Sequence, residues 1–409
     1  MKFLYYLGIQ VFAFLIRFAA LFNQKARLFY KGRKNMFAEL SGIPENKKTI
    51  WFHCASLGEF EQGRPLIEKI KKQHPDYFIL LTFFSPSGYE IRKNYKFADF
   101  VTYLPLDTPG KARRFTALVN PDKVFFIKYE FWYFFLRELH KKGIETYLVS
   151  GVFRKNQFFF RWYGKAFRKM IDWFDYIFVQ DQVSYNLLAS YGYSDIAVSG
   201  DTRLDRVIDI VSNAKEMPLL NEFKQDELLL VAGSSWPKDE ELLIRFFREN
   251  KQPFKMIIAP HEVHDGHIER IISNLKEFNV VRYSEAEGSD LPKADVLIID
   301  SIGLLSALYR YGEFAYIGGG FGKGIHNLLE AATWGIPVVF GPNHDKFKEA
   351  DELKEIGGGF AVNDYEELKK IFNQFLNDDV FLKKAGAKAK NYIQQNSGAT
   401  NVILSKTKL

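Results

Sequence analysis

The residues with the clearest chemistry in this sequence form a glycine-rich stretch, 318–342, with the features of a phosphate-binding loop. A short apolar run at 314–317 is expected to be a buried strand, and glycines follow it at once. Glycines without side chains let backbone N–H groups come close to an anion. The sequence therefore predicts a phosphate loop, to which we assign Gly319, Gly320, Gly322 and Gly324.

A helix is expected directly after this loop, opened by His326 and Asn327 and running to Trp334. Its unpaired N-terminal amides and positive dipole end would favour phosphate. Glu330 would lie about one turn into this helix, where a carboxylate can accept hydrogen bonds from the two hydroxyls of a ribose. A phosphate beside a ribose indicates a nucleotide; the alternative is an ordinary strand and helix joined by a glycine-rich connection.

Two acids and one arginine in the first half are candidates for catalysis. Glu59 follows an expected strand and a tight turn, where a carboxylate could take a proton from a hydroxyl or simply complement a helix dipole. Glu130 follows another expected strand among aromatic residues and needs a partner, so a functional role and a structural ion pair are both open. Arg203 could reach a phosphate or carboxylate, or could form a surface salt bridge.

Strands and helices are expected to alternate along most of the chain, which predicts an α/β protein with parallel sheets. A polar, linker-like stretch at 212–218 separates two such series. We therefore expect two doubly wound domains at 37–211 and 212–409, facing a central cleft, with ligands at the carboxyl ends of the strands. The expected strands are 50–53, 77–82, 100–104, 123–128, 146–150, 176–179 and 196–198, then 228–232, 255–259, 296–299, 314–317 and 338–340.

The first 36 residues are expected to anchor the chain to a membrane. Residues 3–22 are apolar except for Gln10 and Arg17, and about 20 helical residues are long enough to cross a ~30 Å hydrocarbon layer. Gln10, Arg17 and Gln24 recur every seventh residue, which equally suits a helix lying in the interface. Residues 1–38 hold seven Lys or Arg and no acid, which accounts for the net charge of +7 and favours anionic lipid over nucleic acid. A buried core helix is the alternative.

Two further clusters and the single cysteine also bear on possible ligands. Residues 154–173 interleave cations with aromatic rings, which suits a membrane surface, a single-stranded nucleic acid or a helix with an aromatic core face. His261, His264 and His267 are spaced three apart, so neighbouring pairs could share a helical face and hold zinc. The spacing is not that of the His-Glu-x-x-His motif, and we expect a loop that contacts the nucleotide instead. Cys54 alone excludes an internal disulfide.

Four motifs, in this order and spacing, resemble the Kdo (3-deoxy-D-manno-octulosonic acid) transferase family of lipopolysaccharide biosynthesis. The resemblance covers essentially the whole chain. The motifs are Ala55-Ser56-Leu57-Gly58-Glu59, Glu130-Phe131-Trp132, Gly233-Ser234-Ser235 followed by Glu240-Glu241, and the run 326–330 with Phe340-Gly341-Pro342.

The resemblance implies a GT-B glycosyltransferase: two Rossmann-like domains, the first binding the acceptor and the second CMP-Kdo. It implies transfer of Kdo to the lipid A precursor lipid IVA, with inversion and without a required metal or cofactor, at the cytoplasmic side of the inner membrane. Glu59 would be the base, and Glu130 and Arg203 would assist around the transition state. The residues that would hold CMP are Pro260, His261, Ile302, Gly303, Leu304, Asn327, Leu328, Leu329 and Glu330.

The chain departs from the family pattern at four places. His261 stands where arginine is usual, Ile302-Gly303-Leu304 replaces Met-Gly-Glu, Arg203 replaces lysine, and Trp236 stands where histidine is common. Glu59 and Glu330 are unaffected. The alternatives to a Kdo transferase are a GT-B nucleotide-sugar epimerase and a non-catalytic, membrane-associated protein that binds nucleotide or lipid.

Overall fold

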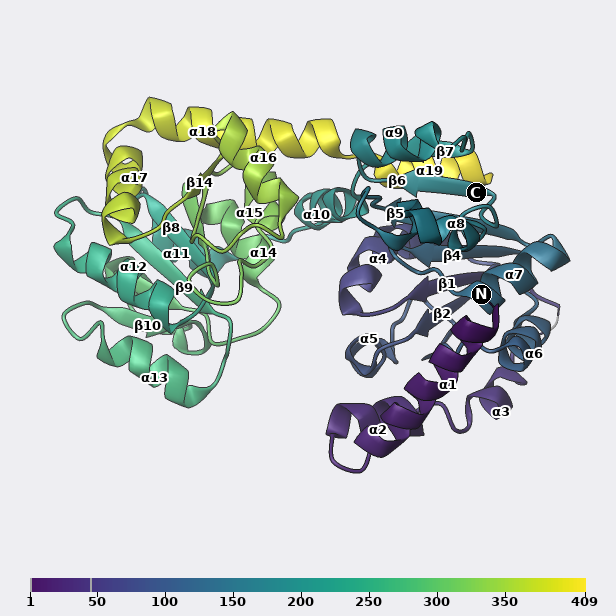
Figure 1. The fold of residues 1–409 in the computed structure, drawn as a ribbon. Coiled ribbons are helices and arrows are strands. Elements are labelled where there is room, and N and C mark those ends of the chain that lie inside the picture. Colours follow the sequence, from purple (N-terminus) through teal and green to yellow (C-terminus); the bar gives the residue numbers. More distant parts are fainter. Residues whose placement is uncertain (1, 45) are drawn as a thin grey trace. The chain divides into compact units, whose positions relative to one another are not determined.

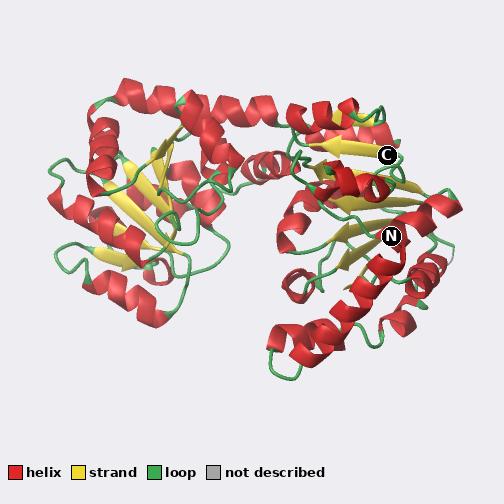
Figure 2. Cartoon of the chain, in the orientation of Figure 1, coloured by secondary structure: helices red, strands yellow, loops and turns green. Residues whose placement is uncertain are grey.

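The computed structural model describes residues 2–44 and 46–409, and it divides the chain into two compact units (Figures 1 and 2). Unit 1 consists of Met1–Arg206 together with Ser397–Leu409, and unit 2 of Val207–Asn396. Each unit holds a seven-stranded sheet in which all pairings are parallel. The predicted α/β class with two Rossmann-like domains is therefore confirmed, while the cleft expected between them stays a prediction.

The sheet of unit 1 has the strand order β3-β2-β1-β4-β5-β6-β7. Alternate residues of β1 point to opposite faces, so Trp51 packs into one hydrophobic core and Ile50 and Phe52 into the other. Both faces are thus covered, as a parallel sheet requires, which explains the near-continuous apolar runs. The strands are β1 (Thr49–Cys54), β2 (Phe78–Phe83), β3 (Phe100–Tyr103), β4 (Lys123–Ile127), β5 (Glu145–Gly151), β6 (Tyr176–Val179) and β7 (Ile196–Val198).

The helices of unit 1 follow its strands, except for three N-terminal helices and one at the C-terminal end. The first three are α1 (Lys2–Ala19), α2 (Gln24–Lys31) and α3 (Met36–Leu40). Those that connect strands are α4 (Leu57–Gln73), α5 (Pro86–Arg92), α6 (Pro109–Val119), α7 (Tyr133–Lys142), α8 (Lys165–Arg168), α9 (Gln182–Ser190) and α10 (Thr202–Ser212), of which α10 crosses the unit boundary.

Unit 2 has the strand order β10-β11-β9-β8-β12-β13-β14. Its strands are β8 (Leu229–Ser235), β9 (Lys255–Pro260), β10 (Val280–Arg282), β11 (Val296–Ile298), β12 (Phe314–Ile317), β13 (Val338–Phe340) and β14 (Gly359–Ala361). Its helices are α11 (Pro218–Lys224), α12 (Pro237–Glu249), α13 (Asp265–Ser273), α14 (Leu305–Leu308), α15 (Leu329–Thr333), α16 (Lys348–Ile356), α17 (Tyr365–Asn377) and α18 (Asp379–Asn396). The sequence did not predict the two edge strands, β10 and β14, which have only three residues each.

Three predictions about individual segments need correction. The helix expected from Asn327 to Trp334 is the shorter α15, which begins at Leu329 and ends at Thr333; the Asn327 side chain accepts from the Leu329 amide just before it. Residues 154–173, for which a single helix was one of three interpretations, form the short 3-10 turns 158–160 and 162–164 and the four-residue α8 instead of that helix. Residues 397–409 belong with unit 1, because Ile403 and Leu404 of α19 (Ala399–Thr407) pack in its core.

The N-terminal segment forms a helix, as predicted. Helix α1 is 18 residues long, has a mean hydropathy of 1.4 and contains no buried residue. By length and composition it is the one candidate membrane span among the described residues.

Candidate active site

The two catalytic carboxylates predicted in unit 1 follow neighbouring strands. Strands β2 and β3 lie on one side of β1 in the sheet. Strands β4 to β7 lie on its other side, so the direction in which strands are added reverses between β1 and β4. In open parallel sheets, ligands bind outside the carboxyl ends of the strands at such a reversal of strand order. Glu59 follows β1 and Glu130 follows β4, so the fold brings both to this position.

Glu59 lies in the first turn of α4, and Ser56 is the residue that caps this helix. The Ser56 hydroxyl donates to the Glu59 carboxylate, and Ser-x-x-Glu is the spacing of a capping box. Glu59 remains partly exposed to solvent. Its position therefore fits both a helix-start acid and a general base, and its catalytic role stays a prediction.

Glu130 is buried, with 6% of its surface exposed, and has two nitrogen partners. The Trp132 indole Nε1 donates to Oε2 of Glu130 over 2.6 Å, and Nε2 of His53 lies 2.9 Å from the same oxygen. The partner that the sequence required for Glu130 is thus a histidine of β1 together with the tryptophan of its own motif.

His53 connects Glu130 to a buried polar chain that the sequence did not predict. Its Nδ1 lies 2.8 Å from the Thr82 hydroxyl, which also accepts from the Trp51 indole over 2.8 Å. If the hydroxyl donates to Nδ1, the proton of neutral His53 is on Nε2, which then donates to Glu130. The sequence did contain one indication of this chain: His53 is a polar residue within an apolar strand, and a buried polar group must find a hydrogen-bond partner.

The pKa of the Cys54 thiol is affected by both carboxylates. Burial raises its pKa well above the usual range, and the charges of Glu59 and Glu130 raise it further.

Arg203 is held by a neighbouring acid. Its Nε lies 2.9 Å and its Nη2 2.5 Å from Oδ2 of Asp201. This agrees with the salt bridge that the sequence left open. A role around the transition state stays a prediction.

The glycine-rich loop of unit 2 follows β12, at the corresponding reversal of strand order. Strand β8 lies between β9 and β12, and the chain leaves it towards β9. Gly319 has φ +94°, and a Cβ there would lie 2.5 Å from the Gly324 carbonyl oxygen. At Gly320 a Cβ would lie 2.6 Å from Cα of Gly341. The glycines are therefore required by close packing of the loop against protein backbone.

Three of the four predicted loop amides donate within the protein. The Gly319 amide donates to Asp239 over 2.8 Å, and the amides of Gly322 and Gly324 donate to the Gly319 carbonyl. Asp239 in turn accepts from the Tyr316 hydroxyl and the Trp236 amide, so it fixes the loop against β12 and α12. Burial raises the pKa of Asp239. Phosphate binding by these amides stays a prediction.

A cavity of about 580 Å³ lies beside this loop. Three lysines line it, which suits a phosphate group, and three aromatic residues offer apolar surface. The lining residues are Trp236, Pro237, Lys238, Asp239, Gly319, Phe321, Gly322, Lys323, Gly324, Ile325, His326, Lys346 and Phe347.

Three rings stack at the edge of this cavity. The His261 ring lies 4.7 Å from Trp236 and 4.3 Å from His326, measured between centroids. The Trp236 indole donates to Nε2 of His326 over 3.0 Å. Burial, aided by His261, lowers the pKa of His326 to about 4, so this nitrogen is an acceptor at neutral pH. His261, assigned to CMP binding, thus belongs to an aromatic platform that includes the unpredicted Trp236.

Glu330 is oriented by two side chains. Nδ2 of Asn327 donates to Oε1 over 2.9 Å, and the Ser306 hydroxyl donates to Oε2. Leu328 and Leu329, also assigned to CMP, are buried, so only their backbone could meet a nucleotide. Their contact with CMP stays a prediction.

The remaining predicted CMP contacts come from two other strand ends. Pro260 is the last residue of β9 and is buried, and residues 302–304 lead from β11 into α14. Ile302 is 89% exposed and Gly303 has φ +95°. Ser306 of α14 joins this loop to Glu330.

The three closely spaced histidines have separate structural partners. His264 caps α13 by accepting from the His267 amide, and His267 contacts the carboxylate of Glu240 at 2.9 Å. Within residues 2–44 and 46–409, no group of three His, Cys, Asp or Glu side chains is placed to hold a metal ion.

Known proteins are similar to this chain in fold or in sequence. Solved structures of similar fold include UDP-GlcNAc 2-epimerase of Neisseria meningitidis bound to UDP-GlcNAc, with a TM-score of 0.60 and 15% identity over 87% of this chain and 98% of that one. Another is MurG of Acinetobacter baumannii, with a TM-score of 0.56 and 14% identity over 89% and 100%. At such identities the likeness concerns the fold alone. The fold class is GT-B.

Sequence comparisons identify similar proteins of one kind. Residues 27–206 match the model described as 3-deoxy-D-manno-octulosonic-acid transferase (kdotransferase). The Kdo transferase of Aquifex aeolicus is 29% identical over 81% of this chain and 87% of its own, and that of Haemophilus influenzae 26% over 87% and 85%. These matches show that the chain is similar to Kdo transferases over most of its length, and it is a glycosyltransferase.

Proposed function

We propose that the protein transfers Kdo from CMP-Kdo to the lipid A precursor lipid IVA, with inversion at the anomeric carbon. One observation carries the proposal. Two carboxylates, Glu59 and Glu130, follow the two strands at which the order of the unit 1 sheet reverses, within the segment that matches the family.

In the proposed reaction, Glu59 takes the proton of the acceptor hydroxyl. The oxygen then forms its bond to the anomeric carbon, and CMP departs with the electrons of the bond that breaks. A partly exposed carboxylate at the start of α4 suits this task because an incoming hydroxyl can reach it.

Glu130 is proposed to act as a fixed charge near the same position, assisted by Arg203. Its hydrogen bonds to His53 and Trp132 hold it in one orientation, and a fixed charge needs no rearrangement when the transition state forms. His53 is then a positioning residue, because it acts through Glu130.

Unit 2 is proposed to hold the CMP part of the donor. The oriented carboxylate of Glu330 would accept from the ribose hydroxyls, and the cavity lysines, including Lys323 and Lys346, would meet the phosphate. The rings of His261 and Trp236 offer a stacking surface. Pro260, residues 302–304 and the backbone of 327–329 would complete the contacts.

The protein is proposed to work at the cytoplasmic face of the inner membrane, where helix α1 reaches the bilayer. The exposed apolar side chains of α1 support this, and so does the excess of cations in residues 1–38. The exposed rings of Trp162 and Tyr163 suit a second contact.

The test is incubation of the full chain with labelled CMP-Kdo and lipid IVA, with the product mass as readout. We expect donor consumption only in the presence of acceptor and a lipid product heavier by one or more Kdo residues. Donor converted without acceptor would point to an epimerase instead, and binding without turnover would point to a non-catalytic protein.

A further inference from the structure

Two adjoining cavities of about 720 and 600 Å³ lie between α1, residues 29–37 and the loop that leads from β3 into α6. They share the lining residues Tyr6, Arg33, Lys34, Leu106, Thr108 and Lys111, and we call them together the cationic cavity. Five cations line it: Arg17, Arg33, Lys34, Lys111 and Arg114. No acidic residue lies among its lining residues.

None of these five cations forms an ion pair with an acid in the part of the chain that the structure describes. The half-buried Arg33 guanidinium donates instead to the carbonyl oxygens of Phe29, Phe84 and Leu104. Burial lowers the pKa of Arg33 to about 9, and burial and repulsion by Arg17 and Arg33 lower the pKa of Lys111. Like charges held together without a counter-ion favour the binding of an anion.

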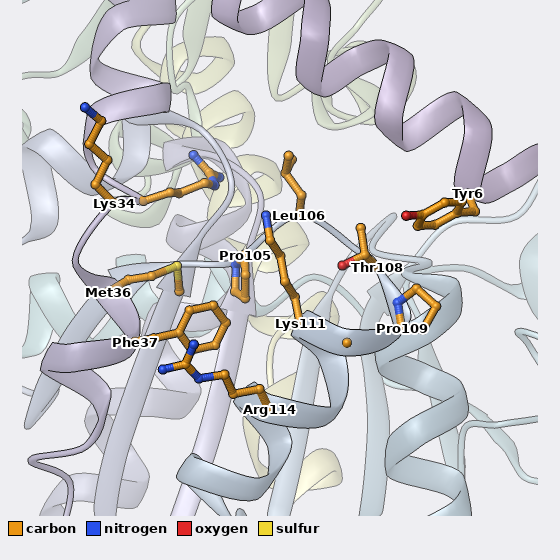
Figure 3. A pocket seen from close by; sticks show the side chains of 12 residues that line it. Tyr6, Lys34, Met36, Phe37, Pro105, Leu106, Thr108, Pro109, Lys111 and Arg114 are labelled. Carbon is orange, nitrogen blue, oxygen red and sulfur yellow. The ribbon is translucent and has the colours of Figure 1, made fainter.

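The donors of the cavity are arranged around one space (Figure 3). The Tyr6 hydroxyl is directed toward the side of the cavity where Lys111 lies, and the Thr108 side chain lies between the two. Ammonium, guanidinium and hydroxyl groups that converge in this way match the oxygens of a phosphate.

One face of α1 packs against the rest of unit 1. Its partly buried residues recur at helical spacing and end in Ala19: they are Tyr5, Ile9, Phe12, Ala13, Ile16 and Ala19. The Tyr5 hydroxyl donates to Asp107 over 2.7 Å, and the Phe12 ring lies 5.8 Å from Phe29. The helix is therefore attached to the protein along most of its length.

The opposite face of α1 is apolar and exposed, with Leu4, Val11 and Phe18 exposed by 70%, 51% and 60%. A helix with one face on its own protein and an apolar face outward suits the plane of the membrane interface. Its flank with Tyr6, Gln10 and Arg17 lines the cationic cavity, which would then lie at the depth of the lipid headgroups.

We propose that α1 lies flat in the membrane interface and that the cationic cavity binds the phosphate of an anionic phospholipid of the same bilayer. The proposal rests on the membrane association proposed above and adds to it an orientation and a lipid site. A bilayer phospholipid is the occupant because α1 itself forms one wall of the cavity.

The orientation can be measured with a fluorescent label at three positions. Leu4→Cys, Val11→Cys and Phe18→Cys lie two turns apart on the outward face, and the native Cys54 is buried and protected. Quenchers at known bilayer depths should find all three labels at one shallow depth. Depths that change by about 10 Å from each label to the next would show a spanning helix and overturn the flat orientation.

The lipid site can be measured by co-sedimentation of the full chain with vesicles of phosphatidylcholine, with and without phosphatidylglycerol. We expect the double variant Lys34→Ala, Lys111→Ala to bind the anionic vesicles at least about tenfold more weakly. The control Lys141→Ala, Lys142→Ala loses the same charge in the exposed last turn of α7 and should stay within about twofold.

Any other outcome of the vesicle experiment contradicts one part of the proposal. Equal losses in both double variants would mean general attraction and no site in the cavity. Displacement by inorganic phosphate beyond that by chloride at the same ionic strength would identify free phosphate as the ligand. A wild-type chain that binds neither vesicle would reject membrane association itself, whereas the transfer assay would still report on the enzyme.

Discussion

At the residue scale, the partners of Glu130 explain how a buried carboxylate is kept in place. Glu130 and His53 are far apart in the sequence, and only the pairing of β1 with β4 brings them together. The sequence showed that Glu130 needs a partner but could not name it, because the register of two strands decides which side chains meet.

We expect His53→Leu to lower kcat about 10- to 100-fold while KM for both substrates changes little. Glu130 would lose a donor and shift, and small displacements of catalytic groups have effects of this order. His53→Gln, which can still donate a hydrogen bond, should restore part of the rate. Steady-state kinetics measures this, and an unchanged kcat in the leucine variant would show that His53 does not position Glu130 for catalysis.

At the scale of elements, the strands were predictable and several connections were not. Parallel strands covered on both faces produce apolar runs, so twelve expected strands correspond to strands of the structure, and only the short edge strands β10 and β14 were missed. The glycine loop was located correctly. The amides of this loop donate to Asp239 and to the Gly319 carbonyl. These hydrogen bonds depend on tertiary contacts, which no local sequence pattern reveals.

Substitutions in this loop separate packing from binding. Gly319→Ala should lower the free energy of unfolding by about 1–3 kcal/mol and weaken CMP binding, because φ is +94° and the new Cβ would collide with Gly324. Gly322→Ala meets nothing closer than 3.5 Å and should leave stability unchanged. Urea unfolding and calorimetry with CMP measure both; equal stability of the two variants would contradict the expected strain.

The ring stack predicts a pH dependence of stability. Because the pKa of His326 is lowered to about 4, the unfolded state binds its proton more readily, so stability should fall as pH decreases from about 6.5 to 4. The ring is partly exposed, so we expect a loss of only about 1 kcal/mol. Urea unfolding of wild type and His326→Gln across this range measures the effect. Identical pH profiles would show that His326 does not contribute.

At the scale of the whole molecule, the two compact units do not follow the order of the chain. Helix α19 returns to unit 1, where Asp205 accepts from the amides of Gly398 and Thr400 over 2.5 and 2.6 Å. The sequence could not show this return, because an apolar face on a terminal helix does not say which core it covers.

We expect Ile403→Ala to destabilise unit 1 by about 2–4 kcal/mol, since the side chain is fully buried in that core. Ser405→Ala, on an exposed position of the same helix, is the control. Hydrogen exchange read by mass spectrometry should show that Ile403→Ala speeds exchange, relative to wild type, more in unit 1 than in unit 2. Faster exchange confined to unit 2 would contradict the assignment of α19.

The central claim is that Glu59 takes the proton of the acceptor hydroxyl. The most direct measurement is the rate of Kdo transfer by Glu59→Gln beside Ser56→Ala, which removes the hydroxyl that contacts Glu59 but keeps the carboxylate. We predict that Glu59→Gln loses at least about 10²- to 10⁴-fold in kcat with CMP-Kdo binding and folding intact, while Ser56→Ala loses far less. Near-normal transfer by Glu59→Gln, or an equal loss in both variants, would contradict the claim and leave Glu59 as an acid that complements the dipole of α4.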